Sequence, residues 1–191
     1  QSGRAPATRL ELADPLTDAM LVQTLQDLRP RDSIIVEEAP STRGATQRYL
    51  PISQPESFFT CASGGLGHSM PAAVGVALGM GDRKTPRKVI AMIGDGSAMY
   101  AIQALWSAAQ LKLPITFVIV NNARYQALHH FSQRFGITQP VGTDLPGINF
   151  VGIARAQGCD GVRVTRASEL VPALKSALQA AVPTLVEVVV T

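Results

Sequence analysis

Six short apolar runs, separated by stretches with helical pattern, restrict the fold of this chain more than any other feature. The runs lie at residues 33–38, 57–62, 87–94, 114–121, 160–164 and 184–190. Their apolar residues follow one another with little alternation, which is typical of strands that helices cover on both faces. The runs therefore predict six strands of a mostly parallel sheet.

Segments with helical periodicity alternate with these runs. In segment 17–30 leucines recur at helical spacing, and either Thr17 or Asp14 is placed to cap the helix start. Further helices are expected at 41–50, 63–81, 98–111, 125–134, 150–157 and 168–180. Alternating strands and helices predict an α/β fold, doubly wound, with a mostly parallel sheet and helices on both faces.

The beginning of the chain differs from the rest. Residues 1–13 are polar, contain Pro and Ala, and have no initiator Met. We expect 1–13 to be a linker or the tail of a preceding region, and 14–191 to form one domain of a longer protein. With 191 residues, 46% hydrophobic and 16% charged, the composition is that of a compact domain.

Charge and cysteine content narrow the possible partners. The net charge is +3, and basic residues gather only at 82–88, where no aromatic residues accompany them, so we expect a solvated loop and no nucleic-acid partner. Cys61 and Cys159 lack metal-ligand spacing and are expected to be reduced thiols. No apolar stretch reaches the roughly 20 residues of a membrane span, so we expect a soluble, cytoplasmic protein without a membrane partner.

Polar or glycine-rich residues stand where four of the predicted strands end. They are Glu37-Glu38, the glycine-rich stretch 63–67, Gly94-Asp95-Gly96-Ser97 and Asn121-Asn122. Ligands of doubly wound sheets bind beyond the carboxyl ends of the strands, where loops lead into helices. These four positions are therefore the candidate binding residues.

Asp95 and Asn122 suggest a cation site. Carboxylate and amide oxygens suit Mg²⁺ or Ca²⁺ better than zinc or copper, and Mg²⁺ is usually held together with substrate phosphates. Gly94 and Gly96 allow the backbone to approach such a ligand, and a helix beginning near Ser97 offers free N–H groups to a phosphate. The stretch predicts half of a metal–diphosphate site.

Simpler interpretations compete with this one. Gly94-Asp95-Gly96 is also suited to a tight strand-to-helix turn, with Asp95 as cap, and the two asparagines are also suited to a left-handed turn. A nicotinamide site is disfavoured because neither glycine cluster completes the dinucleotide-binding pattern, and a phosphate-binding P-loop is disfavoured because no Gly-Lys-Ser/Thr is present.

The spacing of these residues resembles a known signature. Gly94-Asp95-Gly96, 24 intervening residues and Asn121-Asn122 are similar to the thiamine-diphosphate motif of 2-oxo acid decarboxylases, acetolactate synthases and their relatives. The stretches at 60–78, 94–110 and 144–158 resemble the benzoylformate decarboxylases in particular. The resemblance begins near residue 14 and implies the thiamine-diphosphate-binding fold of that family's C-terminal domain.

The resemblance also implies roles for individual residues. Mg²⁺, or Ca²⁺, would be bound by the side chains of Asp95 and Asn122 and by the backbone carbonyl of Arg124. Thiamine diphosphate would be contacted by Ser41, Gly64, Leu66, Gly94, Gly96, Ser97, Tyr100 and Tyr125. The substrate pocket would be lined by Ala127, Leu128 and Phe131.

The implied activity is decarboxylation of a 2-oxo acid to CO₂ and an aldehyde. In the family, the catalytic glutamate and histidines belong to an N-terminal pyrimidine-binding domain, so the resemblance implies no catalytic residue here and inactivity without that domain. It also implies a homodimer or homotetramer for the intact enzyme. An acetolactate synthase-type carboligase and a non-catalytic module of the same fold remain open alternatives.

Other conspicuous side chains are given ordinary roles. Glu37 and Glu38 are expected in a loop with a solvated or structural role. We expect surface or packing roles for His68, His129 and His130. Leu105 and Trp106 are expected on a buried helix face.

Overall fold

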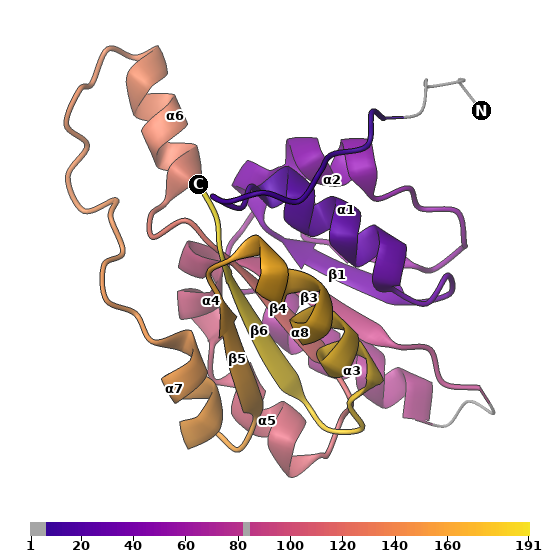
Figure 1. Cartoon of the computed structure of the whole chain (residues 1–191). Coiled ribbons are helices and arrows are strands. Elements are labelled where there is room, and N and C mark those ends of the chain that lie inside the picture. The colour runs from indigo at the N-terminus through magenta and orange to yellow at the C-terminus, as the bar shows by residue number, and fades with distance from the viewer. Residues whose placement is uncertain (1–6, 82–84) are drawn as a thin grey trace.

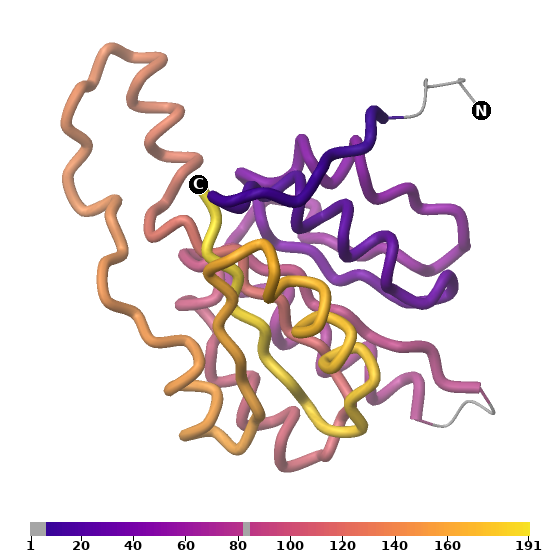
Figure 2. The backbone as a smooth tube through the Cα atoms, in the orientation of Figure 1, coloured from indigo at the N-terminus to yellow at the C-terminus, as the bar shows by residue number. Residues whose placement is uncertain are grey.

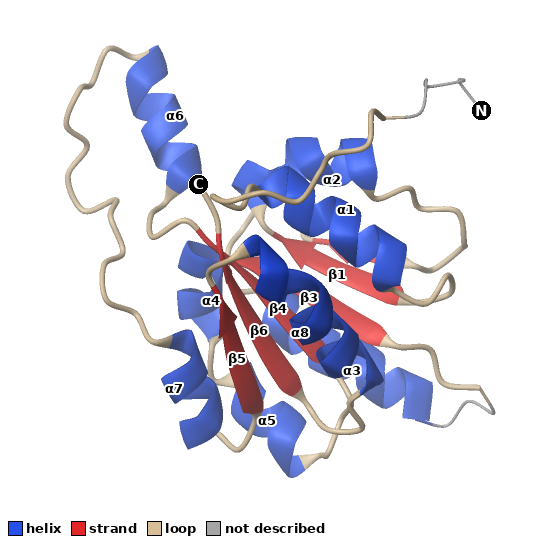
Figure 3. Ribbon diagram, viewed as in Figure 1, coloured by secondary structure: helices blue, strands red, loops and turns tan. Residues whose placement is uncertain are grey.

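A computed structural model describes residues 7–81 and 85–191, and in this part of the chain it shows one parallel sheet (Figures 1 and 3). The strands are β1 (Ile34–Glu38), β2 (Phe58–Thr60), β3 (Val89–Gly94), β4 (Thr116–Asn121), β5 (Asp160–Val164) and β6 (Thr184–Val189). Their order is β2-β1-β3-β4-β6-β5, and all neighbours pair in parallel. The predicted α/β fold and its six strands are confirmed.

Helices cover both faces of the sheet. The helices are α1 (Asp18–Leu28), α2 (Arg43–Tyr49), α3 (Ser69–Gly81), α4 (Asp95–Ala101), α5 (Ala104–Gln110), α6 (Gln126–Arg134), α7 (Phe150–Ala156) and α8 (Ala167–Gln179), with a 3-10 turn η1 (Pro40–Thr42). One face packs against α3, α4, α5 and α7, and the other against α1, α2 and α8. The arrangement is doubly wound, as expected.

The central strand β4 shows why the apolar runs lack alternation. Phe117 and Ile119 belong to the core on one side of the sheet, and Val118 and Val120 belong to the core on the other side. All four side chains are at most 2% exposed. Every position of such a strand faces a helix layer, so apolar residues are favoured throughout.

Two predicted helices differ from the structure. The helix expected at 98–111 is divided into α4 and α5, because the N–H groups of Leu105 and Trp106 bond to carbonyls three residues back. The helix expected at 63–81 begins only at Ser69. Gly64 and Gly67 have φ angles of 70° and 90°, and this left-handed backbone cannot be part of an α-helix.

The helix starts resolve a choice left open by the sequence. Thr17 caps α1, where its Oγ1 accepts a hydrogen bond from the Met20 N–H at 3.2 Å. The Asp14 carboxylate instead accepts from the N–H of Ala167, at 2.7 Å, at the start of α8. The acid therefore joins the beginning of the described chain to its last helix.

The segments predicted as linker and loop are only partly within the described residues. Residues 1–6 and 82–84 lie outside them. Residues 7–13 have no helix or strand, and Leu10 exchanges two backbone hydrogen bonds with the Gln23 side chain, of 2.8 and 2.9 Å. Lys88, expected in a solvated loop, is half-buried, and this burial lowers its pKa to about 8. Its ammonium donates to the carbonyl of Ala180 at the end of α8.

The prediction that Trp106 is buried is wrong. Its side chain is 57% exposed, whereas Leu105 is fully buried. Successive helix residues point about 100° apart. Only one of the two neighbours can therefore face the sheet, and Leu105 does so.

This difference predicts unequal costs of truncation. Leu105→Ala should lower the free energy of unfolding by about 2–5 kcal/mol, because it leaves a cavity in the core. Trp106→Ala should change it by about 0.5 kcal/mol or less, as is usual for surface substitutions. Urea unfolding of the chain, followed by circular dichroism, measures both. Equal losses in the two variants would contradict the assignment of helix faces.

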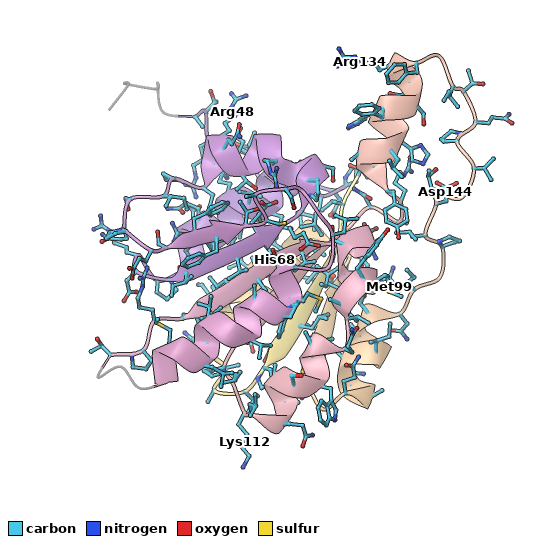
Figure 4. All side chains as sticks on the ribbon, turned by 180° about the vertical axis from the view of Figure 1, so that it is seen from behind. Arg48, His68, Met99, Lys112, Arg134 and Asp144 are labelled. Atoms are coloured by element: carbon cyan, nitrogen blue, oxygen red, sulfur yellow. The ribbon has the colours of Figure 1, made fainter. Side chains whose placement is uncertain are left out.

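One element stands apart from the body of the domain. Helix α6 has no buried residue, and it projects with the loop that follows it (Figures 1 and 2). Arg134 lies near the far end of this projection, and Asp144 lies on the loop that returns to the body of the domain (Figure 4). We call residues 126–147 the α6 arm.

Within the described residues, no helix is long and apolar enough to cross a membrane.

Candidate functional site

The two ends of the Gly-Asp-Gly and Asn-Asn signature meet at one edge of the sheet. Strands β3 and β4 are neighbours, with Gly94 opposite Val120. The Asp95 carboxylate is 3% exposed, and its Oδ2 accepts a hydrogen bond from the Arg124 N–H at 3.2 Å. Its Oδ1 accepts from the Gly96 N–H at 2.8 Å. Asp95 therefore connects the β3–α4 turn with the turn after β4.

Burial has an electrostatic consequence for Asp95. Desolvation raises the pKa of its carboxyl group, and hydrogen bonds from the backbone at Gly96 and at Arg124 only partly oppose that rise. Desolvation disfavours the charged form of an acid. A cation beside the carboxylate would favour the charged form, so the position is electrostatically suited to bind one.

Asn122 provides the observation that tests a metal site. Its Oδ1 is buried and has no hydrogen-bond partner in the part of the chain that the structure describes. Buried oxygens are almost always paired, so an orphaned acceptor requires an explanation. The Arg124 carbonyl accepts from the Gln126 N–H at 3.0 Å, and this bond uses one of its two lone pairs. Carboxylate, amide and carbonyl oxygens together fit Mg²⁺ or Ca²⁺.

A cavity of about 520 Å³ opens at the same edge of the sheet. It is lined by all the residues predicted to contact the cofactor, which are Ser41, Gly64, Leu66, Gly94, Gly96, Ser97, Tyr100 and Tyr125. Asp95 and Arg124 also line it. Asn122 lines an adjoining cavity of about 450 Å³, to which Ser41 and Arg124 also contribute. The two cavities therefore adjoin at Ser41 and Arg124, close to the predicted cation ligands.

Tyr125 packs closely against the glycine that follows Asp95. A Cβ atom placed on Gly96 would lie 2.5 Å from Cε1 of the Tyr125 ring. Only glycine permits this approach. Desolvation, followed by the neighbouring Tyr100, raises the pKa of the Tyr125 phenol, which therefore remains a hydrogen-bond donor near neutral pH.

Two buried glutamates hold the loops around the cavity. Glu38 accepts hydrogen bonds from the N–H groups of Gly67 and Ser69, at 2.6 and 2.7 Å. Glu37 accepts from the Ala39 N–H at 2.7 Å and from the Thr60 hydroxyl at 3.0 Å. Glu37 and Glu38 are the last two residues of β1 rather than loop residues, and their exposures are 0% and 3%, respectively. Their role is structural, and the expected loop position was wrong.

A model of the family described as "Thiamine pyrophosphate enzyme, C-terminal TPP binding domain" matches residues 40–188. The chain belongs to this family. Thiamine pyrophosphate is another name for thiamine diphosphate, so the family supports the predicted cofactor. The family match begins after β1 and extends from β2 to β6, where it ends one residue before the end of that strand.

Named relatives of this thiamine pyrophosphate-binding domain include decarboxylases. Benzoylformate decarboxylase of Pseudomonas aeruginosa is 41% identical over 183 residues, which are 96% of this chain and 34% of the relative. Among solved structures, a thiamine diphosphate-dependent 4-hydroxybenzoylformate decarboxylase of Rhodococcus jostii RHA1 matches with a TM-score of 0.88 at 41% identity, covering 100% of this chain and 37% of its own. Benzoylformate decarboxylase of Polynucleobacter necessarius matches with a TM-score of 0.95 at 34% identity, covering 98% and 36%. The chain thus spans about a third of the length of these relatives.

The predicted substrate-pocket residues of the domain lie in two places. Ala127 and Leu128 line the cavity of about 520 Å³, but Phe131 does not. Phe131 is 61% exposed on α6, and its ring lies 5.5 Å from that of Phe135. All three residues belong to the α6 arm, and the structure brings two of them to the cavity and leaves Phe131 outside it.

The histidines of the domain make local contacts. His129 Nε2 lies 2.9 Å from the Thr143 hydroxyl, and His130 Nε2 lies 2.8 Å from the Gln126 amide nitrogen. His68 Nδ1 lies 3.5 Å from the hydroxyl of Ser69. These are contacts of surface and packing residues, in agreement with the sequence interpretation.

The two free thiols of the domain should differ in reactivity. Cys61 is partly exposed, and its contact with Ser63 lowers its pKa. Cys159 is buried, and burial raises its pKa to about 11. Because the thiolate is the reactive form, we expect iodoacetamide at pH 8 to label Cys61 at least about 100-fold faster than Cys159. Mass spectrometry of the folded chain measures both rates, with Cys61→Ser as control. Similar labelling rates would contradict the burial of Cys159.

Proposed function

We propose that the chain is the diphosphate- and Mg²⁺-binding domain of a thiamine-diphosphate-dependent 2-oxo acid decarboxylase of the benzoylformate decarboxylase type. One observation carries the proposal. The orphaned Oδ1 of Asn122 and the buried carboxylate of Asp95 stand at two adjoining cavities, and the larger of these is lined by every residue predicted to contact the cofactor. The identity to decarboxylases supports the reaction type.

Each group in the site has a proposed task. The side chains of Asp95 and Asn122 and the carbonyl of Arg124 hold the cation, with Mg²⁺ or Ca²⁺ as candidates. Hydroxyl groups donate to the diphosphate oxygens, and they come from Ser41, Ser97, Tyr100 and Tyr125. The Gly64 carbonyl accepts from the cofactor's amino group, and Leu66 supports the cofactor's bent shape.

The chemistry that thiamine diphosphate supplies when bound is a nucleophilic carbon for the 2-oxo group and an electron sink for the loss of CO₂. The protein contributes position and environment. Ala127 and Leu128 give the cavity an apolar wall, which suits an aryl or alkyl substituent. The benzoylformate decarboxylase relatives support a 2-oxo acid with an aryl group.

We further propose that residues 14–191 are the C-terminal domain of a longer, homodimeric or homotetrameric enzyme. The length of the relatives supports additional domains, among them an N-terminal pyrimidine-binding domain that brings the catalytic side chains. Without it the chain would bind cofactor but not turn over substrate. Two free thiols support a cytoplasmic location.

Calorimetric titration of the chain with thiamine diphosphate tests the binding function. We expect saturable binding in the presence of Mg²⁺ and loss of that binding in excess EDTA. NAD without metal serves as the control ligand and should not bind. Saturable NAD binding together with no response to thiamine diphosphate would overturn the proposal.

Product analysis tests the reaction. The chain joined to a pyrimidine-binding domain should convert benzoylformate to benzaldehyde and CO₂. Acetolactate formed from pyruvate, without aldehyde, would instead indicate a carboligase. Cofactor binding without any product from either acid would indicate a non-catalytic module.

A further inference from the structure

A buried glutamate on β6 contacts the strand that leads to the cation site. Glu187 lies opposite Ile119 in the pairing of β6 with β4, and Asn121 lies two residues further along β4. Side chains alternate along a strand, and both residues are on the face that buries Leu185 and Ile119. Asn121 Nδ2 donates a hydrogen bond to Glu187 Oε1 at 2.7 Å. The two side chains are 7% and 0% exposed.

The other end of the Asn121 amide holds a strained turn. Its Oδ1 accepts a hydrogen bond from the Ala123 N–H at 2.9 Å. Ala123 has a φ of 57°, a left-handed conformation that costs a residue with a Cβ atom about 1–2 kcal/mol. Such a conformation persists when surrounding contacts fix it, and the Asn121 side chain is one of these contacts.

This turn carries two of the three proposed cation ligands. Asn122 stands directly before Ala123 and Arg124 directly after it. On the far side, the Arg124 N–H is bound by Asp95 at 3.2 Å. The turn is therefore held from both ends, by Asp95 on β3–α4 and by the Asn121–Glu187 pair.

Glu187 determines which way the Asn121 amide points. A carboxylate only accepts hydrogen bonds, so the NH₂ group must face Glu187 and the oxygen must face the Ala123 N–H. The reversed amide would place its oxygen against the Glu187 carboxylate and its NH₂ group against the Ala123 N–H, and neither pair can form a hydrogen bond. An apolar residue at 187 would pack in the core but would leave the Asn121 NH₂ group without this acceptor.

The position is costly for an acid, which indicates a specific use. Glu187 interrupts an apolar strand, and its Oε2 is buried without a partner among residues 7–81 and 85–191. Arg163 of β5 approaches only Oε1, at 3.5 Å, and its own side chain is 53% exposed. Burying such a group without full pairing is unfavourable.

We propose that Glu187 is a positioning residue for the cation site, acting through Asn121 on the turn at 121–124. The inference rests on the proposed function for the role of that turn, but the link from Glu187 to Ala123 stands on the hydrogen bonds alone. Glu187 itself touches neither cation nor cofactor.

Three variants test the metal-site role at saturating thiamine diphosphate. Glu187→Ala should raise the Mg²⁺ concentration for half-saturation about 10–100-fold, the range found when hydrogen bonds outside the ligand shell are removed. Glu187→Gln keeps an acceptor oxygen for Asn121 and should retain affinity within about threefold. Val186→Ala truncates the adjacent buried residue and should leave the half-saturation point unchanged. Equal effects of Glu187→Ala and Val186→Ala would overturn the role, because that pattern indicates packing alone.

A double-mutant cycle tests the route through Asn121. If Glu187 acts through Asn121, Asn121→Ala combined with Glu187→Ala should weaken Mg²⁺ binding no more than Asn121→Ala alone. Additive losses would show a separate route and contradict the proposal. If Glu187→Ala fails to fold, the Asn121→Ala variant still tests the route. It should weaken Mg²⁺ binding by itself, because Asn121 is the contact through which Glu187 acts.

Hydrogen exchange of the ligand-free chain separates this inference from the proposed function. Glu187→Ala should speed exchange of the Ala123 N–H at least about tenfold, while Glu187→Gln and Val186→Ala should not. If wild type binds no thiamine diphosphate with Mg²⁺, the proposed function fails and with it the metal role of Glu187. If wild type binds both and neither exchange nor Mg²⁺ dependence changes in Glu187→Ala, this inference alone is overturned.

Discussion

Replacing Asp95 by Ala should abolish Mg²⁺-dependent binding of thiamine diphosphate, with a loss of about 100-fold or more, because Mg²⁺ has few protein ligands to share its charge. Asp95 is the charged member of the proposed ligand set, and it also binds the Arg124 N–H. The substitution therefore removes one ligand and releases the turn that carries another. Calorimetry at fixed Mg²⁺ measures the cofactor affinity.

A matched pair of variants makes the Asp95 result interpretable. Asn122→Ala removes the orphaned oxygen and should cause a similar loss of cofactor affinity. Asp27→Ala removes an exposed carboxylate that pairs with Arg9 and should have no effect on it. Thermal unfolding without ligand shows whether each variant is folded. Wild-type affinity in both Asp95→Ala and Asn122→Ala would refute the proposed cation site.

Gly96→Ala should disrupt the site by a different mechanism. The new Cβ would lie 2.5 and 2.6 Å from two carbons of the Tyr125 ring, so the ring must move. Overpacking of this kind typically costs about 1–3 kcal/mol of stability. Displacing Tyr125 also removes a proposed diphosphate donor, and we expect a loss of cofactor affinity of about tenfold or more, since one hydrogen bond to a charged group contributes about 1.5–3 kcal/mol.

Two comparisons isolate the steric cause. Gly75→Ala adds the same methyl group within α3, where no atom lies within 4 Å of the new Cβ, and it should stabilise the chain by up to about 1 kcal/mol. Gly96→Ala combined with Tyr125→Ala should recover stability relative to Gly96→Ala but not cofactor affinity. Urea unfolding and calorimetry give the two quantities. Gly96→Ala with wild-type stability and affinity would contradict the close packing of Tyr125.

The sequence was informative where neighbouring residues share one constraint. The strands were predictable because helices cover both faces of the sheet, as Phe117 and Val118 of β4 illustrate. The meeting of Asp95 with the turn after Asn122 was predictable because the carboxyl ends of parallel strands share one edge of the sheet. The family resemblance then predicted which residues contact the cofactor, and these residues all line one cavity.

Features that depend on contacts between distant segments were not predictable. The helical pattern at 98–111 is continuous, so it could not reveal the break after Ala101 or which of Leu105 and Trp106 faces the core. The role of Glu38 depends on a backbone N–H group, and that of Glu187 on the Asn121 side chain, and both partners lie close only after folding. A signal for Glu187 was present, since an acid within an apolar strand is unfavourable unless it has a partner.

The segment from Gln126 to Phe135 places a wall of the larger cavity next to a pair of exposed aromatic rings. Ala127 and Leu128 line the cavity of about 520 Å³, the rings of Phe131 and Phe135 are exposed to solvent, and Leu128 also lies beside these two rings. Any surface that covers those rings would also reduce the conformational freedom of the wall. By reciprocity, a ligand that orders the wall favours covering of the rings by the same free energy. Occupancy of the cavity and covering of the rings would then rise together.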